Sequence, residues 1–433
     1  MGLILAGERS GVGKTTITLA LLAALTSWGE RVQSFKVGPD YLDPQLHRWV
    51  TGRGCPNLDT MLTSSQYVQN CYHYHTGNVE YALVEGVMGL FDGPSSTAQV
   101  AKLLGLAVVL VVDCGRLAGS VAALVQGYAR FDPQVPVVGV ILNRVASDRH
   151  SELLRAALAP LGMTIVGECR RQTELHYPER HLGLIPPTER ENLAPWRRAL
   201  KTLGQTCFAW DVLRPLLQVH SGGNPVPPWL PLKITHPLRI AVAWDEAFNF
   251  YYDDQLALLR CAGVELYFWS PLRSAPLPTE IQGLILGGGY PELWAEPLSQ
   301  RQDVLQNLRQ RIRQGLAVYA ECGGLMFLGE TLITSDGTAW PLVGAIPLVT
   351  RMMPRLTLGY REIIATLDTC FVAQGQGVTG HEFHYSQGVN PNFPAIYGSA
   401  TLHASYIHCH WGGCPQQVQR FLDCVQQGAA QVV

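Results

Sequence analysis

The chain has 433 residues, of which 47% are hydrophobic and 15% are charged, and its formal net charge is −2. This length is too great for one ordinary hydrophobic core, so we expect two globular domains rather than a disordered chain. A charge near zero gives no indication of a nucleic-acid partner or of an anionic membrane surface. The longest apolar runs are only strand-length, and the opening MGLILAGERSG has no signal-peptide pattern, so neither a membrane span nor a leader is expected.

The 11 cysteines are scattered without a Cys-x-x-Cys pair. This spacing argues against a disulfide framework or a zinc ribbon and favours a cytoplasmic protein in reducing surroundings. The oligomeric state is not indicated by the sequence.

The first part of the chain is expected to alternate short buried strands with helices. Ile17, Leu21, Ala24 and Trp28 recur at the spacing of one helix face. Such alternation predicts an α/β fold, a parallel sheet with helices on both faces. The expected strands are 3–7, 31–38, 81–86, 107–113, 136–143 and 164–168.

The segment GERSGVGKTT, between the first strand and the first helix, is predicted to be a phosphate-binding loop. Its backbone N–H groups would bind phosphate oxygens at a helix N-terminus, Lys14 would bind the terminal phosphates, and Thr15 would ligate Mg²⁺. The first glycine, Gly7, makes the loop one residue longer than the usual spacing. The candidate ATP-binding residues of the loop are Ser10, Gly11, Gly13, Lys14, Thr15 and Thr16.

Polar residues follow three later strands, at the sheet edge where parallel α/β sheets bind ligands. Asp40 and Asp43 lie in FKVGPDYLDPQLH, and Glu85 ends the strand in YALVEG. Each aspartate alone would be read as a turn or N-cap residue, but beside a phosphate loop the carboxylates are candidate Mg²⁺ ligands. Asn143 ends the strand VVGVILN, where its amide is a candidate reader of the base.

Periodicity is lost in VHSGGNPVPPWLPLKITHP, which is rich in Gly, Pro and Asn. We predict a linker at 219–237 between a domain at 1–218 and a domain at 238–433. Strand-and-turn units resume with LRIAVAWD, VELYFWS, GLILGGGYPE and LAVYAECGG. From about Trp340 the runs are short and separated by glycines, which predicts antiparallel pairing.

The stretch AVYAECGGLM has a strand, a sharp turn at Cys322 and the start of a helix, as in a nucleophile elbow. Backbone N–H groups at Gly288, Gly289 and Gly323 are the candidate oxyanion and glutamine-binding groups. The candidate base is His408 in ASYIHCHW.

Blander interpretations compete with this one. A single cysteine is most often a core residue, and the histidines near the C-terminus could be structural or metal ligands. A nucleophilic Cys–His pair is favoured because the glycine turn and the elbow accompany it. The histidines that could share a metal are His403, His408 and His410.

Together, a phosphate loop and an activated thiol predict a glutamine-dependent amidoligase. The thiolate releases ammonia from a carboxamide through a thioester, and ATP converts a carboxylate into an acyl phosphate that ammonia attacks.

The chain also resembles the cobyrinic acid a,c-diamide synthase family over nearly its whole length. The similar motifs, in order, are AGERSGVGKTT, FKVGPDYLDPQLH, NLD, VEGVMGLFDG, LNRVASDRH, HLGLIPPTE, DEAFNFYY, GGGYPE, YAECGGLM, GHEFHYS and ASYIHCHW. The resemblance implies a dethiobiotin-synthetase-like P-loop domain and a class I glutamine amidotransferase-like domain. It also implies amidation of the a- and c-acetates of a cobalt corrinoid with ATP, glutamine and Mg²⁺.

The resemblance assigns roles to the same residues. Cys322 would be the nucleophile and His408 its base. Asp40 and Glu85 would lie at the metal, and Asp43 would lie near the reacting carboxylate. Asn143 would lie close to the adenine. One departure concerns the third member of the amidotransferase triad: many members of the class carry Glu two residues after the histidine, where this chain has His410, so another group orients His408 or the site works as a dyad.

Rival interpretations are amidation of metal-free hydrogenobyrinic acid or of a nickel sirohydrochlorin. A P-loop switch ATPase is the alternative from another class. Switch ATPases usually carry an extra lysine inside the loop, and this loop has none before Lys14.

Overall fold

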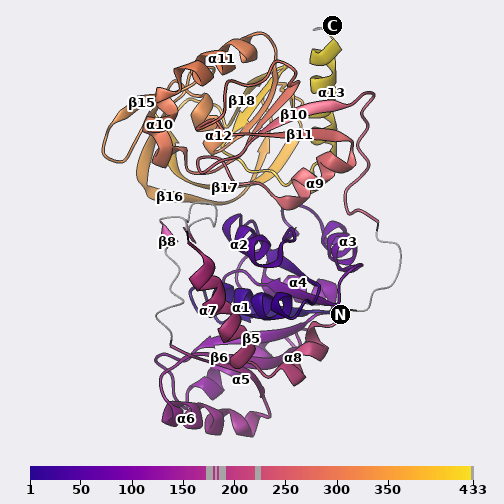
Figure 1. The fold of residues 1–433 in the computed structure, drawn as a ribbon, viewed down its shortest axis with the longest axis vertical. Coiled ribbons are helices and arrows are strands. Elements are labelled where there is room, and N and C mark those ends of the chain that lie inside the picture. The colour runs from indigo at the N-terminus through magenta and orange to yellow at the C-terminus, as the bar shows by residue number, and fades with distance from the viewer. Residues whose placement is uncertain (172–178, 181–182, 185–191, 220–225, 431–433) are drawn as a thin grey trace. The chain divides into compact units, whose positions relative to one another are not determined.

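The computed structural model describes residues 1–171, 179–180, 183–184, 192–219 and 226–430. The chain divides into two compact units, Met1–Pro228 and Trp229–Val433, and the division falls inside the predicted linker (Figure 1). Each unit has its own sheet and its own buried core. None of the described helices is both long enough and apolar enough to cross a membrane.

The first unit is built on a parallel sheet of seven strands. This confirms the predicted parallel sheet, and all six predicted strands are present to within a residue or two at each end. The strands in sheet order are β3 (Asn57–Leu58), β2 (Val32–Val37), β4 (Tyr81–Glu85), β1 (Leu3–Gly7), β5 (Ala107–Asp113), β6 (Val137–Val145) and β7 (Thr164–Arg170).

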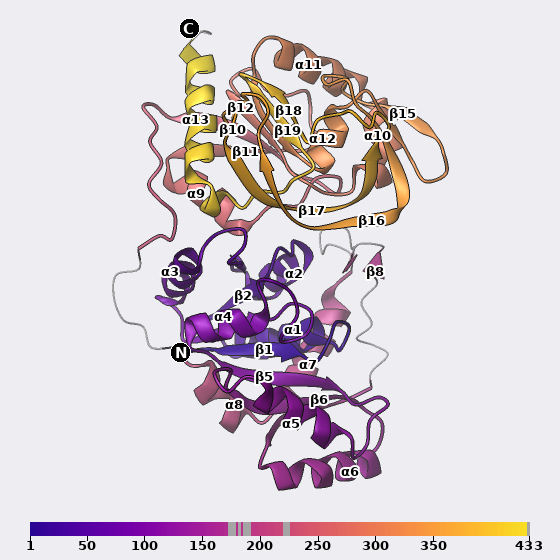
Figure 2. The same ribbon diagram turned by 180° about the vertical axis from the view of Figure 1, so that it is seen from behind.

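Helices cover both faces of this sheet, with α1 and α7 on one face and α4 and α5 on the other (Figures 1 and 2). The helices are α1 (Lys14–Ser27), α2 (Leu42–Thr51), α3 (Ser65–Thr76), α4 (Thr97–Leu104), α5 (Val121–Phe131), α6 (Asp148–Leu158), η1 (Ala159–Leu161), α7 (Ala194–Thr206) and α8 (Trp210–Leu217). A short antiparallel ladder joins β8 (Glu179–Arg180) and β9 (Gly183–Leu184).

Helix α1 is the central packing element of the first unit. Ile17, Leu21 and Ala24 are at most 1% exposed, as their spacing predicts. Trp28 lies beyond the end of the helix, with its ring 4.8 Å from that of Trp210. Helix α7 approaches α1 so closely that a Cβ at Gly204 would lie 2.0 Å from the carbonyl oxygen of Ala20.

The second unit contains a six-stranded sheet in which β18 alone is antiparallel to its neighbour. Its strands in sheet order are β11 (Val264–Trp269), β10 (Leu238–Ala243), β12 (Gly283–Leu286), β13 (Ala317–Glu321), β19 (Leu402–Ser405) and β18 (Ile396–Ser399). The other described elements of this unit's helical layer are α9 (Asp253–Cys261), η3 (Pro291–Trp294), α10 (Ala295–Gln300), α11 (Gln302–Arg313), α12 (Gly323–Leu328), η4 (Trp411–Gly413) and α13 (Pro415–Ala430).

A second, four-stranded sheet follows the nucleophile elbow in the chain. The predicted antiparallel pairing is confirmed, but the prediction of only short strands is wrong, because β16 and β17 have 16 and 12 residues. Glycines at positions 359, 377 and 380 lie within these strands rather than in turns between them. In sheet order the strands are β15 (Ala339–Pro341), β14 (Thr331–Ile333), β16 (Val349–Ile364) and β17 (Gly377–Gly388).

Candidate active sites

The predicted phosphate loop joins β1 to α1 and is held in shape by its glycines and by β6. Gly11 and Gly13 have φ values of 76° and 93°, which other residues rarely adopt. The Asn143 amide nitrogen donates to the carbonyl of Val12 at 2.7 Å, and a Cβ at Gly13 would lie 2.4 Å from the same nitrogen. The loop backbone therefore lies so close to Asn143 that only glycine fits at position 13, and the Asn143 amide contacts the loop backbone directly.

The side chains of the loop divide into exposed and buried groups. Ser10 is exposed, whereas Thr15 and Thr16 are partly buried at the start of α1. Lys14 is 8% exposed, and its ammonium donates to the carbonyls of Met88 at 2.6 Å and Arg9 at 3.3 Å. Burial, and then the charge on Lys36, lowers the pKa of Lys14 to about 8. An added anion would favour the charged form of this lysine.

Thr15, Asp43 and Glu85 converge beside the loop. The Thr15 hydroxyl lies 2.7 Å from Glu85 Oε1 and 3.3 Å from Asp43 Oδ2. Asp40 lies at the edge of this group, because its Oδ1 accepts from the backbone of Leu42 and Asp43 at the start of α2. Asp40 therefore makes the contacts of a helix-capping residue, which was the alternative interpretation of its role. It still lies next to the other carboxylates. These oxygen donors could hold a hard divalent cation such as Mg²⁺.

Two cations in this cluster were missed by the sequence analysis. Lys36 is 3% exposed and donates to Asp43 Oδ2 at 2.6 Å and to Glu85 Oε1 at 3.0 Å. His47 Nε2 lies 2.7 Å from the other oxygen of Glu85. Both residues belong to the motif FKVGPDYLDPQLH quoted above. A lysine at the end of a strand and a histidine one turn along the next helix are the features that could have identified them.

The charges in the cluster shift one another's pKa values. Burial would raise the pKa of Glu85, but Lys36 and His47 outweigh it and hold that pKa far below its usual range. Burial, and then the charge on Asp40, raises the pKa of Asp43 although Lys36 opposes the change. Burial would lower the pKa of His47, but Cys55 and Glu85 outweigh it and raise the pKa to about 10. Asp43 thus accepts a proton more readily than Glu85 does.

The second predicted site is an elbow at Cys322, which lies between β13 and α12. Its φ of 47° and ψ of −102° form a strained turn that is typical of a nucleophile elbow. The helix packs closely behind it, since a Cβ at Gly324 would lie 2.3 Å from the carbonyl oxygen of Leu286. The thiol is 3% exposed, with Sγ 3.9 Å from the Phe383 carbonyl oxygen.

The structure brings His408 and the predicted glycine turn to this elbow. A Cβ at Gly288 would lie 2.4 Å from Cε1 of His408, and one at Gly323 would lie 3.1 Å from the backbone nitrogen of Gly289. Within the described chain, no backbone carbonyl accepts from the N–H of Gly289 or Gly323. These two donors therefore lie close to the elbow without a backbone acceptor, as the candidate oxyanion-binding groups would.

Two neighbouring groups, Cys322 and Glu321, act on the imidazole of His408. Burial would lower the pKa of His408, but Cys322 and then Glu321 outweigh it and raise the pKa to about 10. Nδ1 lies 3.2 Å from Oε1 of Glu321, a residue to which the sequence analysis assigned no role. The position of Glu321 directly before the nucleophile is the feature of the sequence that could have identified it.

The other two histidines considered as metal ligands have different surroundings. Nδ1 of His403 lies 3.1 Å from the Thr369 hydroxyl, and its ring stacks on that of Tyr319. The ring of His410 packs against Tyr252 with centroids 4.7 Å apart. The geometry thus gives His403 and His410 packing contacts rather than a shared metal position with His408.

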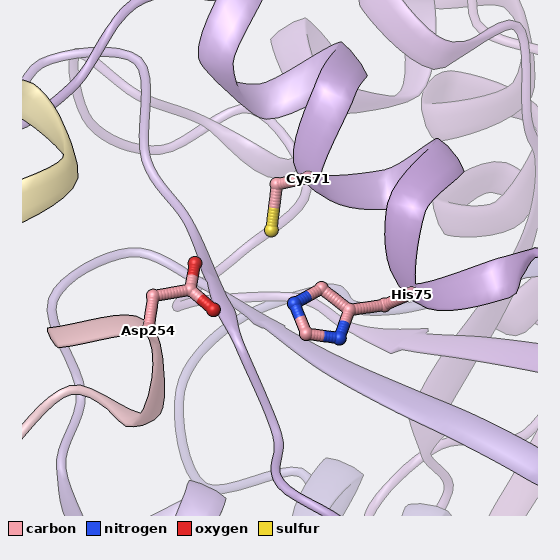
Figure 3. A group of neighbouring side chains, drawn as sticks. All are labelled: Cys71, His75 and Asp254. Carbon is pink, nitrogen blue, oxygen red and sulfur yellow. The ribbon is translucent and has the colours of Figure 1, made fainter. Parts of the chain in front are cut away.

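Outside both sites, Cys71 and His75 lie one turn apart on α3, with donor atoms within 4.8 Å of each other (Figure 3). Two donors from one helix are too few for a structural metal site within the first unit.

Comparisons with known proteins bear on both units. A family model described as a CobQ/CobB/MinD/ParA nucleotide binding domain matches residues 3–185. A family model described as a CobB/CobQ-like glutamine amidotransferase domain matches residues 239–414.

Curated relatives match the chain over almost its full length. A cobyrinate a,c-diamide synthase from a Synechococcus species is 49% identical, with 99% of each chain covered. A protein of the same name from a Synechocystis species is 46% identical, with 97% of this chain and 92% of the relative covered. A hydrogenobyrinate a,c-diamide synthase from Streptomyces coelicolor is 38% identical, with 97% and 96% covered.

Proposed function

Since this chain belongs to the cobyrinate a,c-diamide synthase family, we propose that it amidates the a- and c-acetate carboxylates of cobyrinic acid. It is a glutamine-dependent carbon–nitrogen ligase in which ATP activates the carboxylate and glutamine supplies the nitrogen. The carrying observation is the full-length match at 49% identity, in a chain that has a phosphate loop in one unit and a Cys–His elbow in the other.

We assign glutamine hydrolysis to 238–433, with Cys322 as the nucleophile and His408 as its base. The thiol gives its proton to His408, and the thiolate forms a carbon–sulfur bond to the glutamine side-chain amide carbon. The N–H groups of Gly289 and Gly323 stabilise the developing oxyanion, and Gly288 leaves the space that the imidazole needs. The carbon–nitrogen bond then breaks, His408 returns the proton to the leaving nitrogen as ammonia, and water hydrolyses the thioester to glutamate.

We assign carboxylate activation to 1–218. Lys14 and the loop N–H groups would hold the triphosphate. Its terminal phosphoryl group transfers to the substrate carboxylate to give an acyl phosphate, and ADP leaves. The proposed Mg²⁺ ligands are Thr15, Glu85 and Asp40, which lies at the edge of the group. Mg²⁺ bound there would neutralise phosphate charge. Lys36, between Asp43 and Glu85, limits the negative charge when no cation is present.

Two further roles are proposed. Asp43 would lie beside the reacting carboxylate, where its readily accepted proton suits proton transfer. Asn143 is proposed to read the adenine, although its amide also braces the loop at Val12. The protein is proposed to act in the cytoplasm, which suits a chain whose 11 cysteines form no disulfide.

The metal state of the tetrapyrrole is the finer part of the proposal. Relatives at 49% and 46% identity carry the name cobyrinate, and the relative named for hydrogenobyrinate is 38% identical. This favours the cobalt substrate over the metal-free one.

A substrate panel with the purified protein tests the proposal. ATP, Mg²⁺ and glutamine are supplied with cobyrinic acid, hydrogenobyrinic acid or nickel sirohydrochlorin, and product mass is followed. Two added amides on cobyrinic acid alone are expected. Preference for another tetrapyrrole would overturn the substrate, and ATP hydrolysis without any amidation would favour a P-loop switch.

The Cys322→Ala variant tests the division of labour. It should lose glutamine-dependent amidation and keep ammonia-dependent amidation, because the thiol is needed only to release ammonia. Loss of both activities would contradict the separate roles of the two units.

A further inference from the structure

The carboxylate that completes the Cys–His pair lies directly before the nucleophile in the chain. Strand β13 pairs in parallel with β19, and Glu321 is opposite Ser405, three residues before His408. Glu321 is 1% exposed, and its Oε1 lies 3.2 Å from Nδ1 of His408. We propose that Glu321 is the positioning residue of the glutaminase site, in place of the acid that related enzymes carry two residues after the histidine. This inference rests on the proposed function of Cys322 and His408.

The second oxygen of Glu321 is also held, so the carboxylate has one orientation. Oε2 accepts from the Tyr319 hydroxyl at 2.8 Å and from the backbone N–H of Cys409 at 3.4 Å. Burial raises the pKa of Tyr319 well above its usual value, which keeps this hydroxyl a donor. A carboxylate oxygen accepts, so we assign the proton of this contact to Nδ1 of His408. Nε2 of His408 is then the nitrogen available to take the thiol proton.

The carboxylate acts at two points of the reaction. When Cys322 transfers its proton to Nε2, the imidazolium forms beside a negative charge. The same charge persists until His408 returns the proton to the departing nitrogen. Glu321 therefore orients the ring throughout and stabilises its charged form, without touching glutamine.

Three other residues near His408 in the described chain have contacts of their own. His410, at the expected position of the acid, packs against Tyr252. His381 pairs through its backbone with His408 from β17, and burial, and then the charge on His408, lowers its pKa to about 3. Glu382, the next residue, accepts from Arg361 at 2.7 Å. Within the described chain, the titratable groups that act on His408 include Glu321 from β13, Cys322 from the elbow and His381 from β17.

Glu321→Gln tests the inference because it keeps the size of the side chain and removes its charge. The expected result is a fall of about 10²-fold or more in kcat for glutamine hydrolysis, with KM nearly unchanged. The alkaline limb of the kcat/KM profile should move to lower pH, because the imidazolium loses the charge that favours it. Ammonia-dependent amidation should be unchanged. The matched control is Glu330→Gln, at an exposed glutamate just after α12, which should match the wild type in every assay.

Two outcomes separate the failure of this inference from failure of the proposed function. Wild-type kcat and pH profile in Glu321→Gln, while Cys322→Ala loses glutamine use, would overturn the role of Glu321 alone. Glutamine use by Cys322→Ala would overturn the site itself.

A measurement on the wild-type protein covers the case in which Glu321→Gln does not fold. The ¹⁵N resonances of the His408 ring, assigned by their loss in His408→Gln, should show Nδ1 protonated across the pH range of activity. An unprotonated Nδ1 in that range would overturn the proposal.

Discussion

Replacing Lys36 with methionine tests how the buried charge cluster beside the phosphate loop is stabilised. The ammonium is 2.6 Å from Asp43 and 3.0 Å from Glu85, and the lysine is only 3% exposed. Methionine fills nearly the same volume, so the main change is the loss of charge. Two buried carboxylates would then remain. His47 contacts only Glu85 of the two, and the Thr15 hydroxyl lies closer to Glu85, at 2.7 Å, than to Asp43, at 3.3 Å.

The expected cost follows from the two contacts. Each charge pair is worth about 4 kcal/mol at the effective dielectric constant of a protein. Desolvation of the ammonium offsets several kcal/mol of that sum, and removing one partner of a buried pair typically costs about 3–5 kcal/mol. For a unit of this size, that loss lowers Tm by about 6–20 °C.

The loss should depend on pH with a definite sign. Lys36 lowers the pKa values of Asp43 and Glu85, so without it both folded-state values rise. The pKa of Asp43 then lies further above its unfolded value, and the pKa of Glu85 loses part of its depression below the unfolded value. A carboxyl group with a raised folded pKa destabilises the fold as pH rises above the unfolded value, about 4. The difference in Tm from the wild type should therefore be larger at about pH 8 than at about pH 5.

The assay is thermal unfolding at both pH values, with Lys102→Met as the matched control. Lys102 and Asp132 form a half-exposed surface pair at 2.8 Å, which is worth about 0–1 kcal/mol. Adding Asp43→Asn to Lys36→Met should restore much of the stability. Equal losses for the two lysine variants, or a loss that does not change with pH, would refute the reasoning.

The remaining predictions concern catalysis. Lys14→Ala should lower ATP-dependent amidation by about 10²-fold or more, because the ammonium stabilises transferring phosphate charge, and should leave glutamine hydrolysis unchanged. Steady-state amidation and glutaminase assays check this, and full amidation activity would remove the phosphate-loop assignment. Gly288→Ala should abolish glutamine hydrolysis but not ammonia use, because the new Cβ would lie 2.4 Å from the His408 ring. Retained hydrolysis would show that the ring has room to move.

Local patterns were sufficient to predict six strands of the first unit's sheet and the two loops. Strand β5 was predicted with the observed bounds, because its apolar run ends clearly at Asp113. The phosphate loop and the elbow are each one continuous segment of the chain. Their glycines indicate the tight turns that the backbone makes there.

The residues that the sequence analysis missed act through contacts between distant segments. Lys36 and Glu85 are 49 residues apart, and Glu321 and His408 are 87 residues apart. Their pairing depends on strand order and register, which no local pattern of this chain specifies. The long β16–β17 pair was missed because glycines at 359 and 380 resemble turn residues in the sequence but lie within the strands.

The brace on the phosphate loop links nucleotide binding to the order in which the first unit assembles. Asn143 reaches Val12 across 131 residues of chain, and Arg144 contacts the carbonyl of Gly11 at 3.1 Å. A loop that is already held loses little conformational entropy when a nucleotide enters, so affinity depends on the ligand's charge more than on ordering the protein. The same brace is absent until β6 has joined the sheet. Nucleotide affinity during synthesis or refolding therefore reports the moment at which the sixth strand docks, not the moment at which the loop itself is made.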